Sequence, residues 1–172
     1  LNIPYEILTS KNYKKQIKKA KLFTEKNLSP FALIIEPRFF SNVFKQKNKL
    51  IKGLNREVAI QCIVDSIKND DIIVSTTGKT SRELYEICSA HKRGHNRNFY
   101  NVGSMGHVNV IGLEIALKSK STVYILDGDG AVIMHMGSLA TIGHYQPQNL
   151  THIIFDNKSH ESTGGQPTVS NT

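Results

Sequence analysis

Three short apolar runs constrain the fold of this 172-residue chain more than any other feature. They are DDIIVST at 70–76, STVYILD at 121–127 and LTHIIFD at 150–156. Their centres are apolar throughout instead of alternating with polar residues, which is typical of strands that are buried on both faces. Segments with helical apolar spacing separate the runs. We therefore predict an α/β fold, in which a parallel sheet is covered by helices on both faces.

Helical patterns fill the intervals around these strands. Asn55 is expected to cap the first helix, because its side chain can accept a hydrogen bond from a free backbone N–H group. The apolar face of that helix follows the i, i+3, i+4, i+7 spacing and consists of Ile60, Ile63, Val64 and Ile67. Further helices are expected at 81–92 and 132–143. Residues 91–107 are expected to be irregular and to lead into the apolar segment VNVIGLEIAL.

The basic excess of the chain belongs to its first third. Of 22 Lys and Arg residues and 14 Asp and Glu residues, 12 basic but only 3 acidic residues precede residue 54. Many of these lysines fall in a helix expected at about 11–26, whose apolar face contains Tyr13, Ile17, Ala20 and Phe23. Lysines on the other faces of such a helix are typical of a solvated surface. We therefore expect neither a nucleic-acid partner nor a membrane partner.

Composition also predicts the compartment and the domain boundaries. Cys62 and Cys88 are too few for a disulfide framework, and no apolar run has transmembrane length, so we expect free thiols in a cytoplasmic protein. The short apolar stretch PFALIIEP precedes the polar, lysine-rich segment KQKNKLIKG. Such a segment is typical of a linker. The predicted organisation is a first unit at 1–44, a linker at 45–54 and a domain at 55–172.

Each predicted strand is followed by a chemically suggestive loop: TTGKTS at 76–81, GDG at 128–130 and NKSHESTGG at 157–165. Ligands of open α/β sheets bind beyond the carboxyl ends of the strands, so these loops should converge. TTGKTS looks like the end of a nucleotide P-loop, but Ile73 stands where that motif needs glycine. A glycine turn that opens a helix still presents N–H groups to an anion. A plain helix start with a capping hydroxyl is the alternative.

The GDG loop contains the best candidate for a metal ligand. An EF-hand would need a third ligand at Ala131, so a calcium loop is excluded. A carboxylate such as Asp129, at a strand end beside a phosphate-binding loop, suits Mg²⁺ instead. An ordinary turn aspartate is the alternative. His91 and His95 carry no zinc-site signature.

Four separated motifs in one order resemble thiamine diphosphate-dependent decarboxylases. GDG, with Asn157 standing 28 residues after Asp129, resembles the cofactor signature of the pyruvate decarboxylase and acetolactate synthase superfamily. TTGKTSRELYE, VGSMGH and GGQPT look like phosphonopyruvate decarboxylases in particular. The resemblance covers about residues 55–168. It implies Mg²⁺-dependent decarboxylation of a 2-oxo acid with thiamine diphosphate, which would convert phosphonopyruvate into phosphonoacetaldehyde and CO₂.

The resemblance also implies roles for individual residues. The metal ligands would be Asp129, Asn157 and the backbone carbonyl of Ser159. The cofactor-binding residues would be Gly78, Lys79, Thr80, Gly103, Ser104, Met105, Gly128, Gly130, Ala131 and His160. Met105 would support the bent form of the cofactor, and Lys79 would contact either the diphosphate or the substrate's phosphonate. Asp156 stands where the family usually has asparagine.

Sites of this family are built from two domains. The activating glutamate lies in a pyrimidine-binding domain of the same or a partner subunit, and residues 1–44 resemble only the C-terminal remnant of that domain. The resemblance thus implies a homo-oligomer, truncation at both ends, no catalytic residue in this chain, and no activity of the chain alone. Two alternatives stay open: a β-type subunit of sulfopyruvate decarboxylase, and a non-catalytic module that binds thiamine diphosphate.

Overall fold

The computed structural model describes residues 3–36, 39 and 53–171. The chain divides into two compact units, Leu1–Lys49 and Leu50–Thr172. All but the last two residues of the predicted linker at 45–54 lie outside the described residues. Within the described ranges, no helix is long and apolar enough to cross a membrane.

The first unit contains a small parallel pair of strands and one helix. Strand β1 (Tyr5–Ile7) pairs with β2 (Ala32–Ile34), and α1 (Tyr13–Asn27) connects them. Ala20 on the predicted apolar face is buried, and Phe23 packs edge to face against Phe31 with ring centroids 5.3 Å apart. The predicted helix and the predicted strand of this unit are therefore both present.

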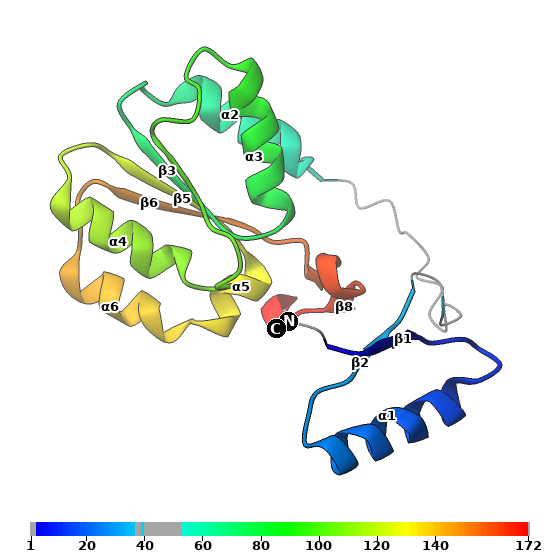
Figure 1. Ribbon diagram of the computed structural model, residues 1–172. Coiled ribbons are helices and arrows are strands. Elements are labelled where there is room, and N and C mark those ends of the chain that lie inside the picture. The colour runs from blue at the N-terminus through cyan, green and yellow to red at the C-terminus, as the bar shows by residue number, and fades with distance from the viewer. Residues whose placement is uncertain (1–2, 37–38, 40–52, 172) are drawn as a thin grey trace. The chain divides into compact units, whose positions relative to one another are not determined.

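The second unit is built on a four-stranded parallel sheet of order β4-β3-β5-β6. Figure 1 shows α2 and α3 over one face of this sheet and α4 and α6 over the other. The helices and strands are α2 (Arg56–Ser66), β3 (Ile72–Ser75), α3 (Lys79–Ala90), β4 (Asn98–Tyr100), α4 (Val108–Lys118), β5 (Val123–Gly128), α5 (Asp129–Met134), α6 (Gly137–Tyr145) and β6 (Leu150–Phe155). The predicted α/β class with helices on both faces is confirmed.

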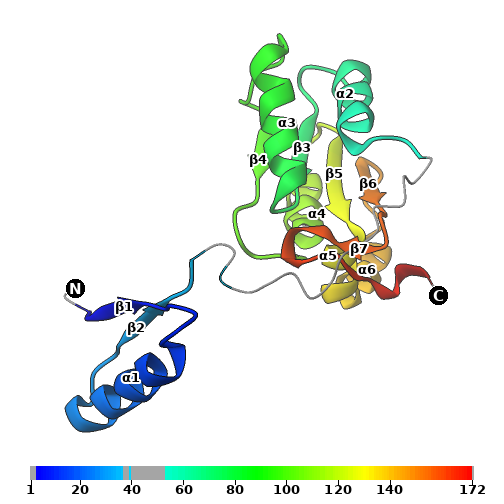
Figure 2. The same ribbon diagram turned by 90° about the vertical axis from the view of Figure 1, so that its right-hand side faces the viewer.

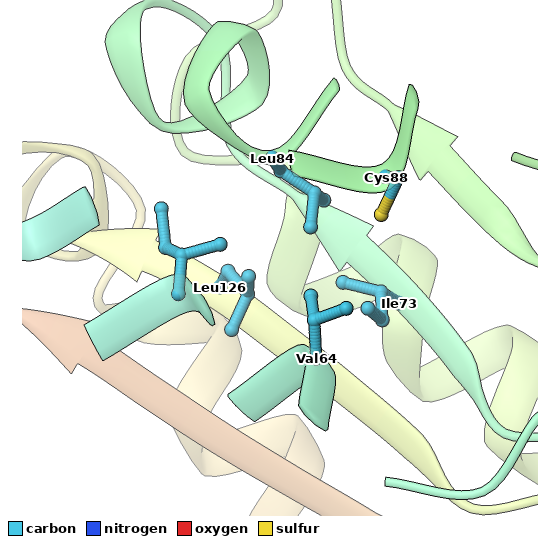
Figure 3. Close-up of a cluster of buried hydrophobic side chains, with 6 residues drawn as sticks. Val64, Ile73, Leu84, Cys88 and Leu126 are labelled. Carbon is cyan, nitrogen blue, oxygen red and sulfur yellow. The ribbon is translucent and has the colours of Figure 1, made fainter. Parts of the chain in front are cut away.

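Apolar side chains from the sheet and from both helix layers form two buried clusters. On the α2/α3 face the cluster consists of Ile60, Val64, Ile73, Leu84, Cys88 and Leu126. Figure 3 shows the labelled members Val64, Ile73, Leu84, Cys88 and Leu126 facing one another. On the α4 face it consists of Val74, Val108, Ala116, Val123 and Ile125. Burial of one such aliphatic side chain contributes about 1.5–3 kcal/mol. The central strands β3 and β5 are therefore apolar because both of their faces are covered, whereas no residue of the edge strands β4 and β6 is buried.

Asn55 and the cysteines lie as the sequence predicts. The Asn55 side chain accepts a hydrogen bond from the Glu57 N–H group at 2.9 Å, which caps α2. Cys62 is exposed and Cys88 is buried, and both are free thiols.

The structure corrects three predictions of local structure. Residues 91–107, expected to be irregular, contain strand β4, which is recognisable only because β3 offers it a pairing edge. The expected helix at 132–143 is split into α5 and α6, since His135 leaves helical geometry with a φ of −129°. The GDG turn is instead the end of β5 followed directly by the first residues of α5.

A small C-terminal hairpin follows β6. Strand β7 (Ser159–His160) pairs antiparallel with β8 (Gln166–Pro167), and the 3₁₀ helix η1 (Glu161–Thr163) lies between them. A second 3₁₀ helix, η2 (Val169–Asn171), ends the described chain. Figure 2 shows β7 beside α5, close to the carboxyl ends of β5 and β6. The hairpin therefore lies at the edge of the sheet where the predicted loops should meet.

Tyr100 makes the stability of this fold depend on pH. Its ring packs edge to face against Tyr85, and its hydroxyl accepts a hydrogen bond from Asn98 at 2.9 Å. Burial raises the pKa of Tyr100 from 10.0 to about 12. As pH rises, the unfolded state therefore loses this proton first, and stability falls between about pH 10 and 12.

Replacing Tyr100 by phenylalanine is expected to reduce that pH dependence. The free energy of unfolding, measured in urea at several pH values, should fall less steeply above pH 10 in Tyr100→Phe than in the unchanged protein. Tyr145 is 56% exposed, so Tyr145→Phe is the matched control and should keep the original slope. If the free energy of unfolding fell equally steeply with pH in the unchanged protein and in Tyr100→Phe, Tyr100 would not be the source of this pH dependence.

Candidate functional site

A cavity of about 250 Å³ lies at the carboxyl ends of the central strands. The loops after β3 and β6 and the junction of β5 with α5 all contribute to its lining, as the sequence predicts from their positions after the strands. Met105 adds a side chain from the loop after β4. The cavity therefore brings together residues that are distant in sequence.

Eleven of the predicted site residues line this cavity: Gly78, Lys79, Thr80, Met105, Gly128, Asp129, Gly130, Ala131, Asn157, Ser159 and His160. Gly103 and Ser104 do not line it, but they belong to the same loop as Met105. Asn101 donates hydrogen bonds from its Nδ2 atom to the carbonyls of Gly103 at 3.2 Å and Ser104 at 2.9 Å. This buried amide fixes the loop that carries Met105.

The TTGKTS loop forms a tight turn between β3 and α3. Gly78 adopts φ 98° and ψ −139°, and this positive φ favours glycine because residues with a side chain rarely adopt it. Lys79 then begins α3, and the Ser81 hydroxyl donates to the carbonyl of Thr76 at 2.7 Å. The alternative of a hydroxyl-capped helix start is wrong, because the N-cap residue is Gly78 and has no side chain. The first N–H groups of α3 therefore lack an intrahelical partner beside the cavity.

Asp129 is buried and held by the C-terminal segment. Its Oδ2 atom accepts hydrogen bonds from the Thr168 hydroxyl at 2.5 Å and from the Ser170 hydroxyl at 3.3 Å. Asp129 is 6% exposed and Thr168 is 7% exposed. The two hydroxyl groups therefore hold this buried carboxylate in a fixed orientation at the cavity wall.

The other two predicted metal ligands come from the loop after β6. The Ser159 N–H group donates to Asn157 Oδ1 at 3.0 Å, so the two residues form one local turn. Together with Asp129 they offer carboxylate, amide and carbonyl oxygens, which are the donors that Mg²⁺ prefers. The set of donors on the cavity wall fits a magnesium ion beside a phosphate group.

Gly130 allows the hairpin to approach α5 closely. A Cβ atom at this position would lie 2.8 Å from His160 Nδ1 and 3.5 Å from Met105 Cε. A side chain at residue 130 would therefore displace His160 and narrow the cavity. This close approach explains why glycine suits the second position after β5.

Asp156 is linked to Asp129 through one hydroxyl. Ser170 Oγ donates to Asp156 Oδ1 at 2.9 Å and also contacts Asp129. The hydrogen bond from Ser170, followed by that from the Lys158 N–H group, holds the pKa of Asp156 below its usual range. The Asp156 carboxylate therefore helps to anchor the C-terminal segment.

Sequence reasoning missed two charged residues of the cavity wall, Arg56 and Glu161. Arg56 donates to both carboxylate oxygens of Glu83 at 2.7 Å and contacts Glu161 at 3.3 Å. Lys79 lies 2.5 Å from the other oxygen of Glu161 and, with Arg56, holds the pKa of Glu161 below its usual range. One signal could have identified Arg56: only residues 67–71 connect α2 to β3, so the helix has to run back along the strand and begin near the carboxyl edge of the sheet.

Comparisons with known proteins agree with this geometry. Residues 76–172 match the family described as thiamine pyrophosphate enzyme, C-terminal TPP binding domain. The chain is 44% identical over 115 residues, 67% of its length, to a phosphonopyruvate decarboxylase of Streptomyces viridochromogenes. It is 43% identical over 109 residues, 63% of its length, to the sulfopyruvate decarboxylase subunit beta of Methanocaldococcus jannaschii.

The matched regions are only parts of these relatives. They cover 28% of the Streptomyces protein and 55% of the Methanocaldococcus subunit. The family match covers more than half of the present chain and includes the segments 76–81, 128–131 and 157–163 at the cavity. The chain belongs to the thiamine pyrophosphate enzymes, and residues 76–172 correspond to their C-terminal, TPP-binding domain.

Proposed function

We propose that the protein carrying this chain is a thiamine diphosphate- and Mg²⁺-dependent decarboxylase of a 2-oxo acid, with phosphonopyruvate as its substrate. The observation that supports this most is the convergence of Asp129, Asn157 and the TTGKTS turn on one cavity. The 44% identity to phosphonopyruvate decarboxylase supports the choice of substrate. Phosphonopyruvate would lose CO₂ and gain a proton, and phosphonoacetaldehyde would leave.

The proposal gives the cavity residues distinct binding tasks. Asp129, Asn157 and the Ser159 carbonyl would hold Mg²⁺, and the turn at Gly78 with the start of α3 would face the diphosphate. Met105 would support the cofactor rings from the loop after β4. When bound, the cofactor supplies an electron sink for the loss of CO₂. The residues of this chain bind and orient it and exclude water.

A second domain is part of this proposal. The glutamate that activates the cofactor would come from a pyrimidine-binding domain of the same or a partner subunit. None of the glutamates at 57, 83, 86, 114 and 161 matches its position in the family's motifs. A relative named as a subunit, the sulfopyruvate decarboxylase subunit beta, is consistent with a site that is shared between chains.

Sulfopyruvate decarboxylation is the second candidate. The chain is 43% identical to the Methanocaldococcus jannaschii beta subunit, nearly the same value as for the phosphonopyruvate enzyme. Phosphonate and sulfonate are both tetrahedral anions on the carbon next to a keto group, so one set of cationic side chains can bind either.

Turnover by the protein and by the isolated chain tests the proposal. We expect the full-length gene product to release CO₂ from phosphonopyruvate faster than from sulfopyruvate or pyruvate. We expect the 172-residue chain alone to release none, because the activating glutamate would come from the second domain. The measurement is CO₂ release with thiamine diphosphate and Mg²⁺ present.

Other turnover results would favour one of the alternatives or contradict the proposal. Faster turnover of sulfopyruvate would favour the second candidate. Failure of the full-length protein with all three substrates would favour a non-catalytic binding module. CO₂ release by the isolated chain would contradict the two-domain site.

A further inference from the structure

Two cations and one carboxylate meet at the cavity wall. Glu161, the first residue of η1, accepts a hydrogen bond from Lys79 on Oε1 at 2.5 Å and from Arg56 on Oε2 at 3.3 Å. All three residues line the cavity. A carboxylate that bridges two cations occupies a position where an anionic group of a ligand could bind in its place.

Arg56 is fixed before any ligand binds. Its Nε and Nη2 atoms donate to the two oxygens of Glu83 at 2.7 Å each, and its side chain is 21% exposed. Such a paired contact fixes the plane of the guanidinium group. The Nη1 atom, which is the one that contacts Glu161, therefore keeps its orientation when Glu161 moves.

Glu161 is held much less firmly than Arg56. Its side chain is 46% exposed, and that of its partner Lys79 is 48% exposed. Ion pairs at this exposure contribute little to stability and are screened by salt. Glu161 also lies in the C-terminal hairpin, whose turn contains Gly164 at φ 128° and Gly165 at φ 74°. A competing anion therefore has to replace three contacts of a half-exposed carboxylate, from Lys79, from Arg56 and, at 3.5 Å, from Asn157 Nδ2.

We infer that Arg56 and Lys79 form an anion-binding pair, and that Glu161 occupies this pair until a phosphoryl or phosphonate group of a ligand displaces it. The inference rests on the proposed function for the source of the anion. That source is either the diphosphate of the cofactor or the acidic group of the substrate. Glu161 acts here as a competitor within the chain and not as a catalytic residue.

The test is anion binding by Glu161→Gln, which removes the charge and keeps the size of the side chain. Calorimetric titrations use inorganic diphosphate and 3-phosphonopropionate, each with and without saturating thiamine diphosphate and Mg²⁺. Affinity for at least one probe should rise roughly two- to fivefold, the range expected for one partly exposed ion pair. Glu86→Gln on the exposed side of α3 removes the same charge outside the cavity and should leave affinity unchanged.

A double variant separates a local effect from a general change in charge. Adding Lys79→Gln to Glu161→Gln should remove most of the gain in anion affinity. The ammonium group of Lys79, which Glu161→Gln leaves free for the anion, is then missing. A gain that persists without Lys79, or that Glu86→Gln reproduces, would overturn the inference. Equal affinities in Glu161→Gln and the unchanged protein for both probes would overturn it too.

Comparing the titrations with and without thiamine diphosphate shows whether the pair binds the cofactor's diphosphate or the substrate's acidic group. If saturating thiamine diphosphate removes the gain for both probes, the pair binds the cofactor's diphosphate. If the gain for 3-phosphonopropionate persists, the pair binds the substrate's acidic group. Absence of thiamine diphosphate binding by the unchanged protein would contradict the proposed function alone, because inorganic diphosphate still reports on the pair.

Discussion

Replacing Asp129 by alanine is expected to abolish the Mg²⁺-dependent binding of thiamine diphosphate. Asp129 is the carboxylate among the three proposed metal ligands, and its loss removes the negative charge that faces the ion. The loss of affinity should exceed the roughly 10- to 100-fold decrease that follows when only the support of a metal ligand is changed. Isothermal titration of thiamine diphosphate in the presence and absence of Mg²⁺ measures it.

Two further variants keep this prediction interpretable. Asp129→Asn has nearly the same shape and can still accept the hydrogen bond from Thr168, so it should fold and yet bind the Mg²⁺ complex far more weakly. Asp70→Ala removes a carboxylate from an exposed position outside the cavity and should bind normally. Unchanged binding by both Asp129 variants would rule out the proposed metal site.

Replacing Thr168 by valine is expected to weaken Mg²⁺ binding by roughly 10- to 100-fold, although Thr168 is not a proposed ligand. Its buried hydroxyl donates to Asp129 Oδ2 at 2.5 Å and thereby holds the carboxylate in one orientation. Valine fills a similar volume but cannot donate, so the carboxylate loses its support. The measurement is the Mg²⁺ concentration needed for half-maximal thiamine diphosphate binding.

The conservative substitution provides the control for this second prediction. Thr168→Ser retains the hydroxyl and should need a Mg²⁺ concentration close to that of the unchanged protein. Thermal unfolding of both variants shows whether the fold is intact. A normal Mg²⁺ requirement in a folded Thr168→Val variant would mean that Thr168 serves only the packing of the C-terminal segment.

The fold could be predicted where local pattern and tertiary environment agree. The runs around Ile73 and Ile125 are apolar because helices cover both faces of the two central strands, and that requirement is visible in the sequence itself. The run around Ile153 forms the edge strand β6, in which no residue is buried. Strand β4 could not be predicted, since NFY has only three residues and becomes a strand by pairing with the edge of β3. The break at His135 was missed because the apolar spacing continues across it.

The candidate site also has a part that could be predicted from the sequence and a part that could not. Asp129, Asn157 and Gly78 follow strand ends, and parallel strands must bring their carboxyl ends to one edge, so their convergence was predictable. The contact of Thr168 with Asp129 joins residues 39 positions apart and depends on how the C-terminal segment folds back. No spacing rule connects Arg56 with Glu161, which are 105 positions apart.

By itself, the sequence determined the parallel α/β sheet, the three segments that follow its strands at the carboxyl edge, and the resemblance to thiamine diphosphate enzymes, because these follow from local patterns of residues. Only the tertiary structure decided which side chains support the site. Thr168 orients Asp129, and Glu161 bridges Lys79 and Arg56, through contacts between distant segments. Such contacts depend on the path of the whole chain, which the residues at each end of a contact do not encode.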